Sequence, residues 1–352
     1  MTEKRKDPIP AIGKRCTRQD GGSVSAGTGE VMSELFKENP ILYIVIPCYN
    51  EEEVIEETIR RLTLKMDGMI ESKMVAAESR FMLVNDGSKD RTWEIIGQLC
   101  QNNPYVTGLT LAHNRGHQNA LLAGLMTAKE YADIAISMDA DLQDDIHAVD
   151  RFVEEYKKGA DIVYGVRSSR EKDTFFKKNT ALAFYKLMAM LGVETVHNHA
   201  DYRLMSKRAL NELERFKEVN LFLRGIIPMI GFKTAQVEYV REERFAGESK
   251  YPLKKMIAFA IEGITSCSVK PLRMITMFGI TISAISLLYL IYVICGSLAG
   301  HTVAGWATLA VLICFFGGAQ ILCIGVVGQY IGKIYNETKA RPRYIIEEKI
   351  LK

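Results

Sequence analysis

Three oxygen-bearing side chains, spaced two residues apart, follow an apolar run near the middle of the chain. The run, Ile134–Met138, has the character of a buried strand, and Asp139, Asp141 and Gln143 come directly after it. Such side chains can converge on one point just beyond the strand. Mg²⁺ and Mn²⁺ prefer oxygen ligands, and Mg²⁺ typically takes one or two carboxylates together with phosphate oxygens. The stretch therefore fits a cation bound to a diphosphate, but it fits equally well an acidic turn that caps a following helix.

Three further segments that end in polar, turn-forming sequence are expected to be strands. They are Ile41–Pro47, which is a continuous apolar run, Arg80–Val84 and Val106–Leu111, and each is followed by a helical pattern. Repeated βα units of about 30 residues predict a parallel sheet with right-handed crossovers. Ligands bind such sheets beyond the carboxyl ends of the strands, where the four polar sequences would meet. This shared position favours the metal–diphosphate interpretation over the helix cap.

Other patterns exclude several classes of protein. No G-x-G-x-x-G follows the first expected strand and no G-K-[ST] occurs, which argues against a dinucleotide site and a P-loop. The seven cysteines form no C-x-x-C pair, so reduced thiols and no structural zinc are expected. A net charge of +3 gives no indication of a nucleic-acid partner. Residues 1–40 are polar and basic and are expected to be a disordered tail.

The pattern changes after a fifth expected strand. We expect that strand at Asp161–Val166, a charged loop at Arg167–Lys178, helices at Asn179–Leu191 and Ser206–Phe216, and a last strand at Gln236–Val240. Next comes an amphipathic segment, Pro252–Lys270, of a kind that can lie in a membrane interface.

A long tract without charge follows. Met274–Gly332 contains no Lys, Arg, Asp or Glu, and it has room for two spans of about 20 residues, near Ile275–Cys295 and Ala304–Val327. Lysines and arginines flank only the outer ends of this pair. The positive-inside rule therefore predicts that both termini and the soluble part lie in the cytoplasm. A buried helical hairpin in a soluble core is the disfavoured alternative.

Taken together, the polar sequences resemble those of family 2 glycosyltransferases with a GT-A-type fold. They are Pro47–Glu52, Asn85–Ser88 and Asp139–Asp144. The resemblance is closest to the polyprenyl-phosphate glycosyltransferases, the branch that includes dolichol-phosphate mannose synthase and the bactoprenol glucosyltransferases. That branch also has two C-terminal membrane helices and shows segments similar to Gly247–Tyr251, Gly328–Gly332 and Arg341–Tyr344. The likeness covers the chain from about Ile41 to its end.

This resemblance implies a domain order. An α/β catalytic domain with a GT-A-type, Rossmann-like and mostly parallel sheet would occupy residues 41–250. An amphipathic juxtamembrane helix would follow at 251–272, a two-helix transmembrane hairpin at 273–332 and a cytoplasmic C-terminal tail at 333–352. Homo-oligomers could form through the membrane helices.

The resemblance also assigns site residues. The nucleotide-sugar would contact Pro47, Tyr49, Glu51, Val84, Asp86, Ala140 and Arg167. Mg²⁺ or Mn²⁺ would bind Asp139, Asp141 and Gln143, and the acceptor phosphate would meet Arg203, Arg244, Ser249 and Lys250. Asp201 and Arg203 match an Asp-aromatic-Arg-Leu motif and form the expected catalytic set with Asp141. Asn85 stands where many relatives have Asp, which leaves the nucleotide open. Arg224 is followed by Gly225, so the Gln-x-x-Arg-Trp motif of processive synthases is missing.

The implied reaction is a metal-dependent, inverting transfer of one sugar to a membrane polyprenyl phosphate, for cell-envelope glycan modification. UDP-glucose is the first expected donor, followed by UDP-GlcNAc and GDP-mannose. A phosphate monoester has a second pKa of about 6, so the acceptor is largely dianionic near neutral pH and needs no strong base. Asp201 is therefore expected to orient the sugar or acceptor, and to act as a base only at lower pH.

Two other functions remain as alternatives. One is a glycosyltransferase that acts on another lipid or on a glycan, and the other is an inactive homologue that serves as a membrane scaffold. The intact set of Asp139, Asp141 and Gln143 argues against the scaffold.

Overall fold

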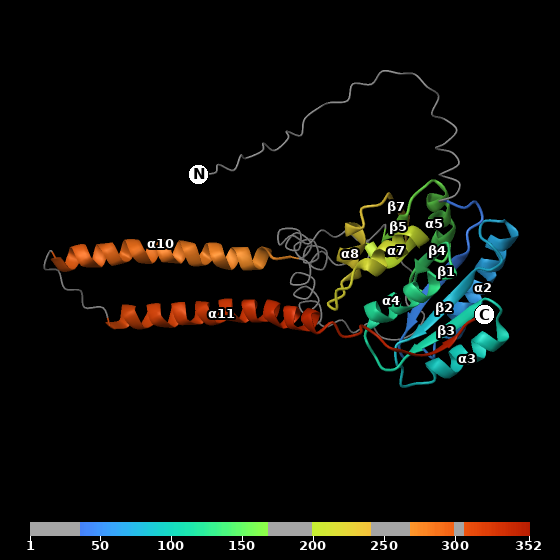
Figure 1. Ribbon diagram of the computed structural model, residues 1–352, viewed down its shortest axis with the longest axis horizontal. Helices are drawn as coiled ribbons and strands as arrows, with labels where there is room; N and C mark the ends of the chain where they lie inside the picture. The colour runs from blue at the N-terminus through green and yellow to red at the C-terminus, as the bar shows by residue number, and fades with distance from the viewer. Residues whose placement is uncertain (1–35, 168–198, 241–267, 299–305) are drawn as a thin grey trace, which may run out of the picture.

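The computed structural model describes residues 36–167, 199–240, 268–298 and 306–352. Their strands form one sheet of eight, in the order β7-β5-β6-β4-β1-β2-β3-β8. The strands are β1 Leu42–Cys48, β2 Arg80–Asn85, β3 Val106–Leu111, β4 Ile134–Ser137, β5 Ile162–Arg167, β6 His199–Ser206, β7 Thr234–Tyr239 and β8 Ile346–Ile350. Figure 1 shows this sheet and its helices as one globular part from which two long helices project.

The centre of the sheet is parallel. Strand β1 pairs in parallel with β2 and β4, and β2 pairs in parallel with β3. Strand β6 runs antiparallel between β4 and β5, and β5 pairs in parallel with β7. The expected mostly parallel sheet is thus confirmed, and the polar sequences after β1, β2, β3 and β4 lie at one edge of it.

Helices cover both faces of the sheet. The apolar cluster on one face includes residues of α2 (Ile55–Glu71), α3 (Thr92–Asn102) and α5 (Ala148–Lys157). The other face is covered by α4 (His117–Ala128), α7 (Lys207–Arg215) and α8 (Leu223–Met229). Alternate residues of β1 enter opposite clusters, as expected for a strand buried on both faces.

A close approach fixes α4 on the sheet. A Cβ atom at Gly124 would lie 2.4 Å from Val45 Cγ1 and 2.6 Å from Val84 Cγ2, so only glycine lets the helix pack at this depth. The N-terminal end of α4 is thereby held at the sheet edge that carries the polar sequences.

The C-terminal segment joins the sheet, in contrast to the tail expected at residues 333–352. Strand β8 pairs antiparallel with β3, and the Ala112 amide donates to the Ile345 carbonyl at 3.0 Å. This strand is short, lies at the sheet edge and exposes Glu347, Glu348 and Lys349, so its sequence lacks the apolar run that identified the buried strands. The first of the two long helices also begins within the segment expected as amphipathic, of which residues 251–267 lie outside the described part.

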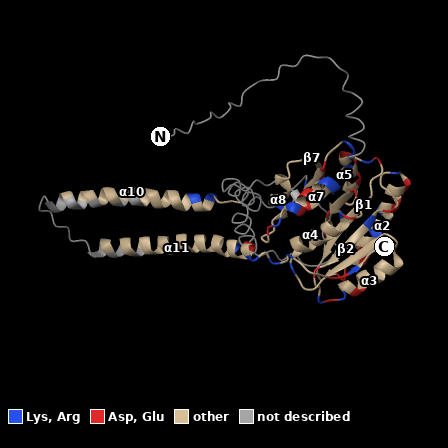
Figure 2. Cartoon of the chain, in the orientation of Figure 1, with Lys and Arg blue, Asp and Glu red and all other residues tan. Residues whose placement is uncertain are grey.

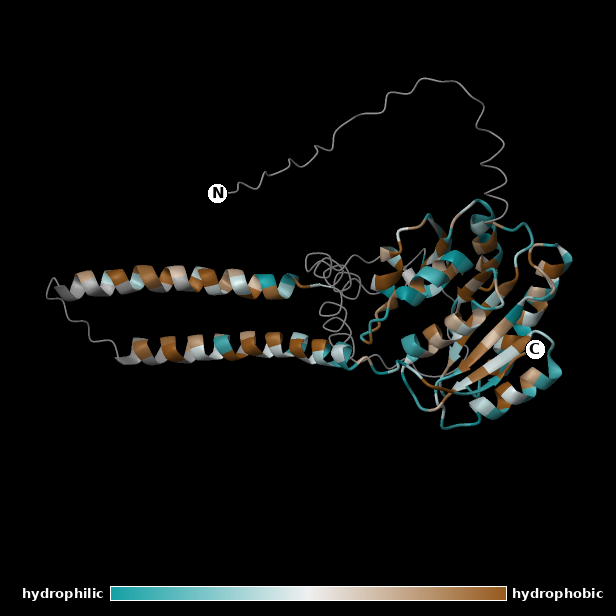
Figure 3. Cartoon of the chain, viewed as in Figure 1, coloured by the Kyte–Doolittle hydropathy of each residue, from teal (hydrophilic) through white to brown (hydrophobic). Residues whose placement is uncertain are grey.

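Two apolar helices follow the globular part. They are α10 (Lys270–Leu298) and α11 (Trp306–Lys339), which lie side by side and are long and apolar enough to cross a membrane. Figure 3 shows hydrophobic residues along both, and Figure 2 shows their charged residues only at the ends nearest the globular part. The Tyr330 hydroxyl donates to the Ser268 carbonyl at 2.7 Å and ties α11 to the residues that precede α10.

Candidate active site

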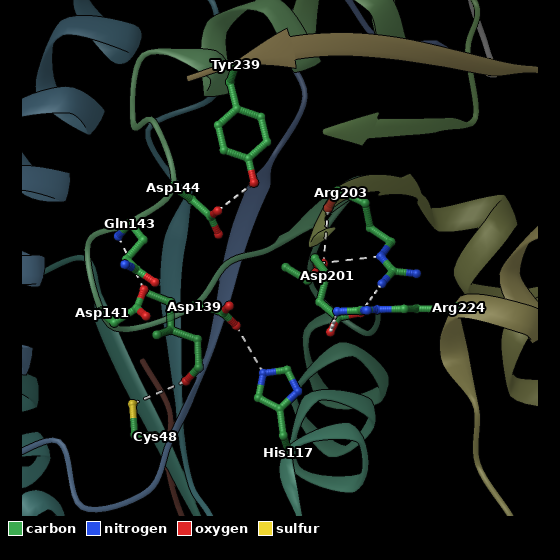
Figure 4. Close-up of polar contacts among 12 residues, drawn as sticks. Cys48, His117, Asp139, Asp141, Gln143, Asp144, Asp201, Arg203, Arg224 and Tyr239 are labelled. Atoms are coloured by element: carbon green, nitrogen blue, oxygen red, sulfur yellow. Dashed lines mark hydrogen bonds and ion pairs between the residues drawn. The ribbon is translucent and has the colours of Figure 1, made fainter. Parts of the chain in front are cut away.

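The expected metal-binding side chains lie in the turn that follows β4. The Gln143 amide donates to Asp141 Oδ1 at 3.2 Å, which folds the two residues into one tight turn (Figure 4). Leu142 between them has a φ of 58°, a left-handed conformation that is costly for a bulky residue. The buried Leu142 side chain, 3% exposed, holds this turn against the core.

The donors in this turn fit a hard cation. Asp139 and Asp141 offer carboxylates and Gln143 an amide oxygen, the ligand types that Mg²⁺ and Mn²⁺ take. Within the described residues, no group of three or more His, Cys, Asp or Glu side chains is arranged to hold a metal ion. Two carboxylates are enough for a cation that also binds the oxygens of a diphosphate.

His117 contacts the first carboxylate of this turn. It is the first residue of α4, and its Nε2 lies 3.1 Å from Asp139 Oδ1 (Figure 4). Burial acts to lower the pKa of His117, but the hydrogen bond and the charge of Asp139 outweigh it, so the pKa lies above its usual value.

A second, compact cluster surrounds Asp201. Both oxygens of this carboxylate are bound by guanidinium groups: Arg203 pairs with Oδ1, and Arg224 donates to Oδ1 at 3.2 Å and to Oδ2 at 3.0 Å. Burial acts to raise the pKa of Asp201, but the charges of Arg203 and Arg224 outweigh it and hold the pKa below its usual range. The geometry favours an orienting role for Asp201 over a role as a base.

The two arginines differ in exposure. The Arg203 side chain is 1% exposed, and its Nη1 has no hydrogen-bond partner among the described residues. Arg224 comes from α8 and keeps 32% of its side chain exposed. Two cations share one carboxylate here, so the cluster carries a net positive charge beside the acidic turn, and such a charge suits an anionic ligand.

A third group of polar residues involves Asp144, which follows Gln143 in the acidic turn. The Tyr239 hydroxyl donates to Asp144 Oδ1 at 2.7 Å, and Arg167 Nε donates to the Tyr239 hydroxyl at 3.3 Å. Burial and the charge of Asp139 raise the pKa of Asp144 above its usual value. These contacts connect Arg167, at the end of β5, to the acidic turn.

The residues expected to hold the nucleotide lie at the ends of β1, β2 and β4, with different exposures. Tyr49 is 43% exposed, whereas Val84 is fully buried and packs in the core, so its side chain is not accessible to a nucleoside. Pro47 is also buried, and Ala140 is 4% exposed and accepts a hydrogen bond from Thr58 through its carbonyl. Pro47, Val84 and Ala140 can therefore act only as packing or backbone groups.

Asp86 has partners of its own. Its two oxygens accept hydrogen bonds from the amides of Arg115 and Gly116, at 2.7 and 2.9 Å. Burial raises the pKa of Asp86 above its usual value, although these two hydrogen bonds act against that change. Asp86 thus fixes the turn that leads into α4.

The loop after β1 is tied to the loop after β2. The Asn50 amide donates to Ser88 Oγ at 3.1 Å, and the Lys89 amide donates to Asn50 Oδ1 at 2.9 Å. In the same loop the Glu51 amide donates to Thr92 Oγ1 at 3.0 Å. These bonds tie the loop that carries Tyr49 and Glu51 to the residues after β2.

The structure brings together part of the expected site. Asp139, Asp141, Gln143, Asp201 and Arg203 lie around one region (Figure 4), with Arg167 joined to it through Tyr239 and Asp144. Arg244, Ser249 and Lys250, expected at the acceptor phosphate, lie outside the described residues.

Sequence reasoning left His117, Arg224 and Tyr239 out of the expected site. His117 stood in a recognised polar segment after a strand, which was the available signal. Arg224 was considered only as part of a motif that is missing here.

Comparison with known proteins places the chain among sugar-transferring enzymes. Residues 43–214 match the family model described as Glycosyl transferase family 2. The glycosyltransferase YkoT of Bacillus subtilis (strain 168) is 56% identical over 88% of this chain and 91% of its own length. A bactoprenol glucosyl transferase of Shigella phage SfX is 40% identical over 87% of this chain and 98% of its own.

Among solved structures, one match is the mannosyltransferase PcManGT of Pyrobaculum calidifontis in complex with GDP-Man and Mn²⁺. It is 16% identical with a TM-score of 0.40 and covers 84% of this chain and 88% of its own.

Proposed function

The chain belongs to glycosyl transferase family 2 and is a glycosyltransferase, and from this premise we propose that it transfers one sugar from a nucleotide-sugar to a membrane polyprenyl phosphate. The observation that carries the proposal is the pairing of an acidic turn with the Asp201–Arg203–Arg224 cluster, on a chain that continues into two apolar helices. The 40% identity to a bactoprenol glucosyl transferase extends over 87% of this chain and supports the same acceptor.

The acidic turn would hold the leaving diphosphate. Asp139, Asp141 and Gln143 would bind Mg²⁺ or Mn²⁺, which supplies positive charge to the diphosphate when bound. Tyr49, in the loop after β1, would offer its exposed ring to a nucleobase. UDP-glucose is the proposed donor, ahead of UDP-GlcNAc.

The arginine cluster would receive the second anion. Two negatively charged groups must approach each other in this reaction, so a positively charged neighbour lowers the repulsion between them. Arg224 is accessible and suited to bidentate contact with a phosphate, and Asp201 holds its guanidinium in place. Arg244, Ser249 and Lys250 are proposed to contact the same phosphate. Attack in a single displacement would invert the anomeric centre.

The two helices would keep the site at the bilayer surface. We propose that α10 and α11 span the cell membrane, with the globular part and both termini in the cytoplasm. The lipid acceptor would then stay in the bilayer while the sugar donor arrives from solution. Association through the helices stays a prediction.

A panel of donors tests this proposal. Membranes that contain the protein are supplied with polyprenyl phosphate and, in turn, labelled UDP-glucose, UDP-GlcNAc and GDP-mannose. We expect label in the lipid fraction with one donor above the others, and UDP-glucose to be that donor. If none of the three donors gives label in the lipid fraction, the proposal is contradicted.

The transfer rate is expected to fall as the pH drops through about 6, because the dianionic acceptor phosphate then takes up one proton and becomes a monoanion. Asp201 does not contribute to this loss. Its pKa lies below the usual value of about 3.9, so it stays ionised, and its contribution to stability is lost only at still lower pH. The measurement is kcat/KM for the acceptor between pH 5 and 8. A profile that is flat across this range would contradict an acceptor that reacts as the dianion.

A further inference from the structure

The connection between α7 and α8 is held by the C-terminal end of α11. Glu337 accepts three hydrogen bonds there: from the Val219 amide at 2.8 Å, the Asn220 amide at 2.8 Å and the Asn220 side-chain amide at 2.7 Å. The same side-chain amide lies 3.4 Å from the Lys333 carbonyl, one turn back along the helix. Arg343, just beyond α11, also donates to the Phe216 carbonyl at the other end of the connection.

Helix α11 is long enough to bring Glu337 out of a bilayer. Its 34 residues extend over about 51 Å, whereas the hydrocarbon core of a bilayer is about 30 Å thick. The final turns can therefore stand in the headgroup region or beyond it. In Figure 1 this end of α11 meets the globular part on the side where α4 and α8 lie.

The negative charge of Glu337 lies at an unfavourable position in α11. A negative side chain in the last turn of a helix is disfavoured by the helix dipole. Glu337 occupies that turn, two residues before α11 ends at Lys339. Its three accepted hydrogen bonds offset this cost, because bonds to a charged acceptor are stronger than those between neutral groups. The residue is suited to holding the connection rather than to stabilising the helix.

The held connection leads directly into the active site. The Leu223 amide, three residues after Asn220, donates at 2.9 Å to Gln118 Oε1 on α4. Gln118 follows His117, the residue that contacts Asp139. Arg224, which follows Leu223 in the chain, binds Asp201. Four residues span at most about 14 Å, so the contact with Glu337 lies close to Arg224 along the chain.

We infer that Glu337 is a positioning residue. Through its hydrogen bonds to Val219 and Asn220, it fixes the Arg224–Asp201 pair at a set height above the bilayer. The inference rests on the proposed function, because height matters only when one substrate is held in the membrane. A nucleotide-sugar approaches from solution and does not depend on this distance. Loosening the contact therefore affects the lipid acceptor selectively.

The isosteric change Glu337→Gln tests this inference, since it removes the charge and one acceptor oxygen but keeps the size of the side chain. In phospholipid vesicles that contain polyprenyl phosphate, we expect KM for this lipid to rise about 10-fold, with the donor KM within about twofold of its normal value. With a water-soluble ten-carbon isoprenyl phosphate, kcat/KM should not change. Amide hydrogen exchange at residues 219 and 220 should become about 10-fold faster. Glu348→Gln, an exposed change on β8, is the matched control and should alter none of these values.

Three results would each contradict the positioning role of Glu337. An unchanged KM for the vesicle-bound lipid contradicts the positioning role. Equal losses with the lipid and the soluble acceptor, together with a lower unfolding temperature, also contradict it and assign Glu337 a general structural role. If the unaltered protein makes no lipid-linked sugar from polyprenyl phosphate, the proposed function fails, and the positioning role falls with it.

Discussion

Replacing Asp141 by Ala is expected to lower the rate of sugar transfer by at least about 100-fold, the loss seen when one group that stabilises developing charge is removed. Asp141 is 8% exposed and accepts a hydrogen bond from the Gln143 amide, so it anchors the turn in addition to its proposed role as a metal ligand. Without it, a cation on the diphosphate keeps only one carboxylate from this turn. The measurement is initial rate with labelled nucleotide-sugar, at several Mg²⁺ and Mn²⁺ concentrations.

Asp67→Asn serves as the control for this change. Asp67 lies exposed on α2, where it accepts a hydrogen bond from Tyr105, and it belongs to none of the three polar clusters of the site. Its replacement should leave the rate within about twofold. Asp141→Ala with full activity, or with a loss that the control shares, would contradict the role of the acidic turn.

Replacing Asp201 by Asn is expected to destabilise the protein and to remove activity together. The change leaves the buried guanidinium of Arg203 without its counter-ion, and breaking a buried ion pair from one side costs about 3–5 kcal/mol. Because Asp201 keeps 16% of its side chain exposed, the expected cost is at the lower end of this range. For a domain of this size, about 3 kcal/mol lowers the unfolding temperature by roughly 10 °C. The measurement is the unfolding temperature of the purified protein.

Arg224→Ala separates binding from stability at the same cluster. Arg224 is one-third exposed, and Asp201 would still be paired with Arg203, so the loss of stability should stay within about 1 kcal/mol. Transfer should nevertheless fall by at least about 10-fold, because the exposed guanidinium is the one accessible to a phosphate. Arg215→Ala, which removes an exposed arginine paired with Glu212, is the matched control and should change neither property. Normal transfer by Arg224→Ala would remove this residue from the proposed acceptor site.

The parts of the site that the sequence predicted share one property: they follow buried strands. Asp139 and Asp141 come directly after an apolar run, and parallel strands bring such positions to one edge of the sheet whatever the remaining details. The core strands were predictable for the same reason, since β1 to β4 are largely apolar and almost wholly buried. The local sequence pattern was sufficient to predict a segment's position where the order of βα units determines its neighbours in the sheet.

The remaining parts depend on contacts between distant segments. Arg224 reaches Asp201 because α8 and β6 contribute to the same apolar cluster, and no periodicity in either segment specifies that pairing. Strand β8 follows a long apolar helix in sequence yet pairs with β3, some 240 residues earlier. Glu337 looks like an ordinary polar residue at a helix end until its partners, Val219 and Asn220, are known. A single sequence carries little information on such pairings. A polar side chain is also commonly found exposed to water, so its type does not reveal whether it has a partner in the fold.

The most direct test of the central claim is sugar transfer by the purified protein in phospholipid vesicles, with labelled nucleotide-sugar and with polyprenyl phosphate either present or left out. We expect label in the organic phase only when polyprenyl phosphate is present, and its loss when a chelator removes the divalent cation. Label that appears on lipid without polyprenyl phosphate, or transfer that continues at the same rate with the chelator, would contradict the account.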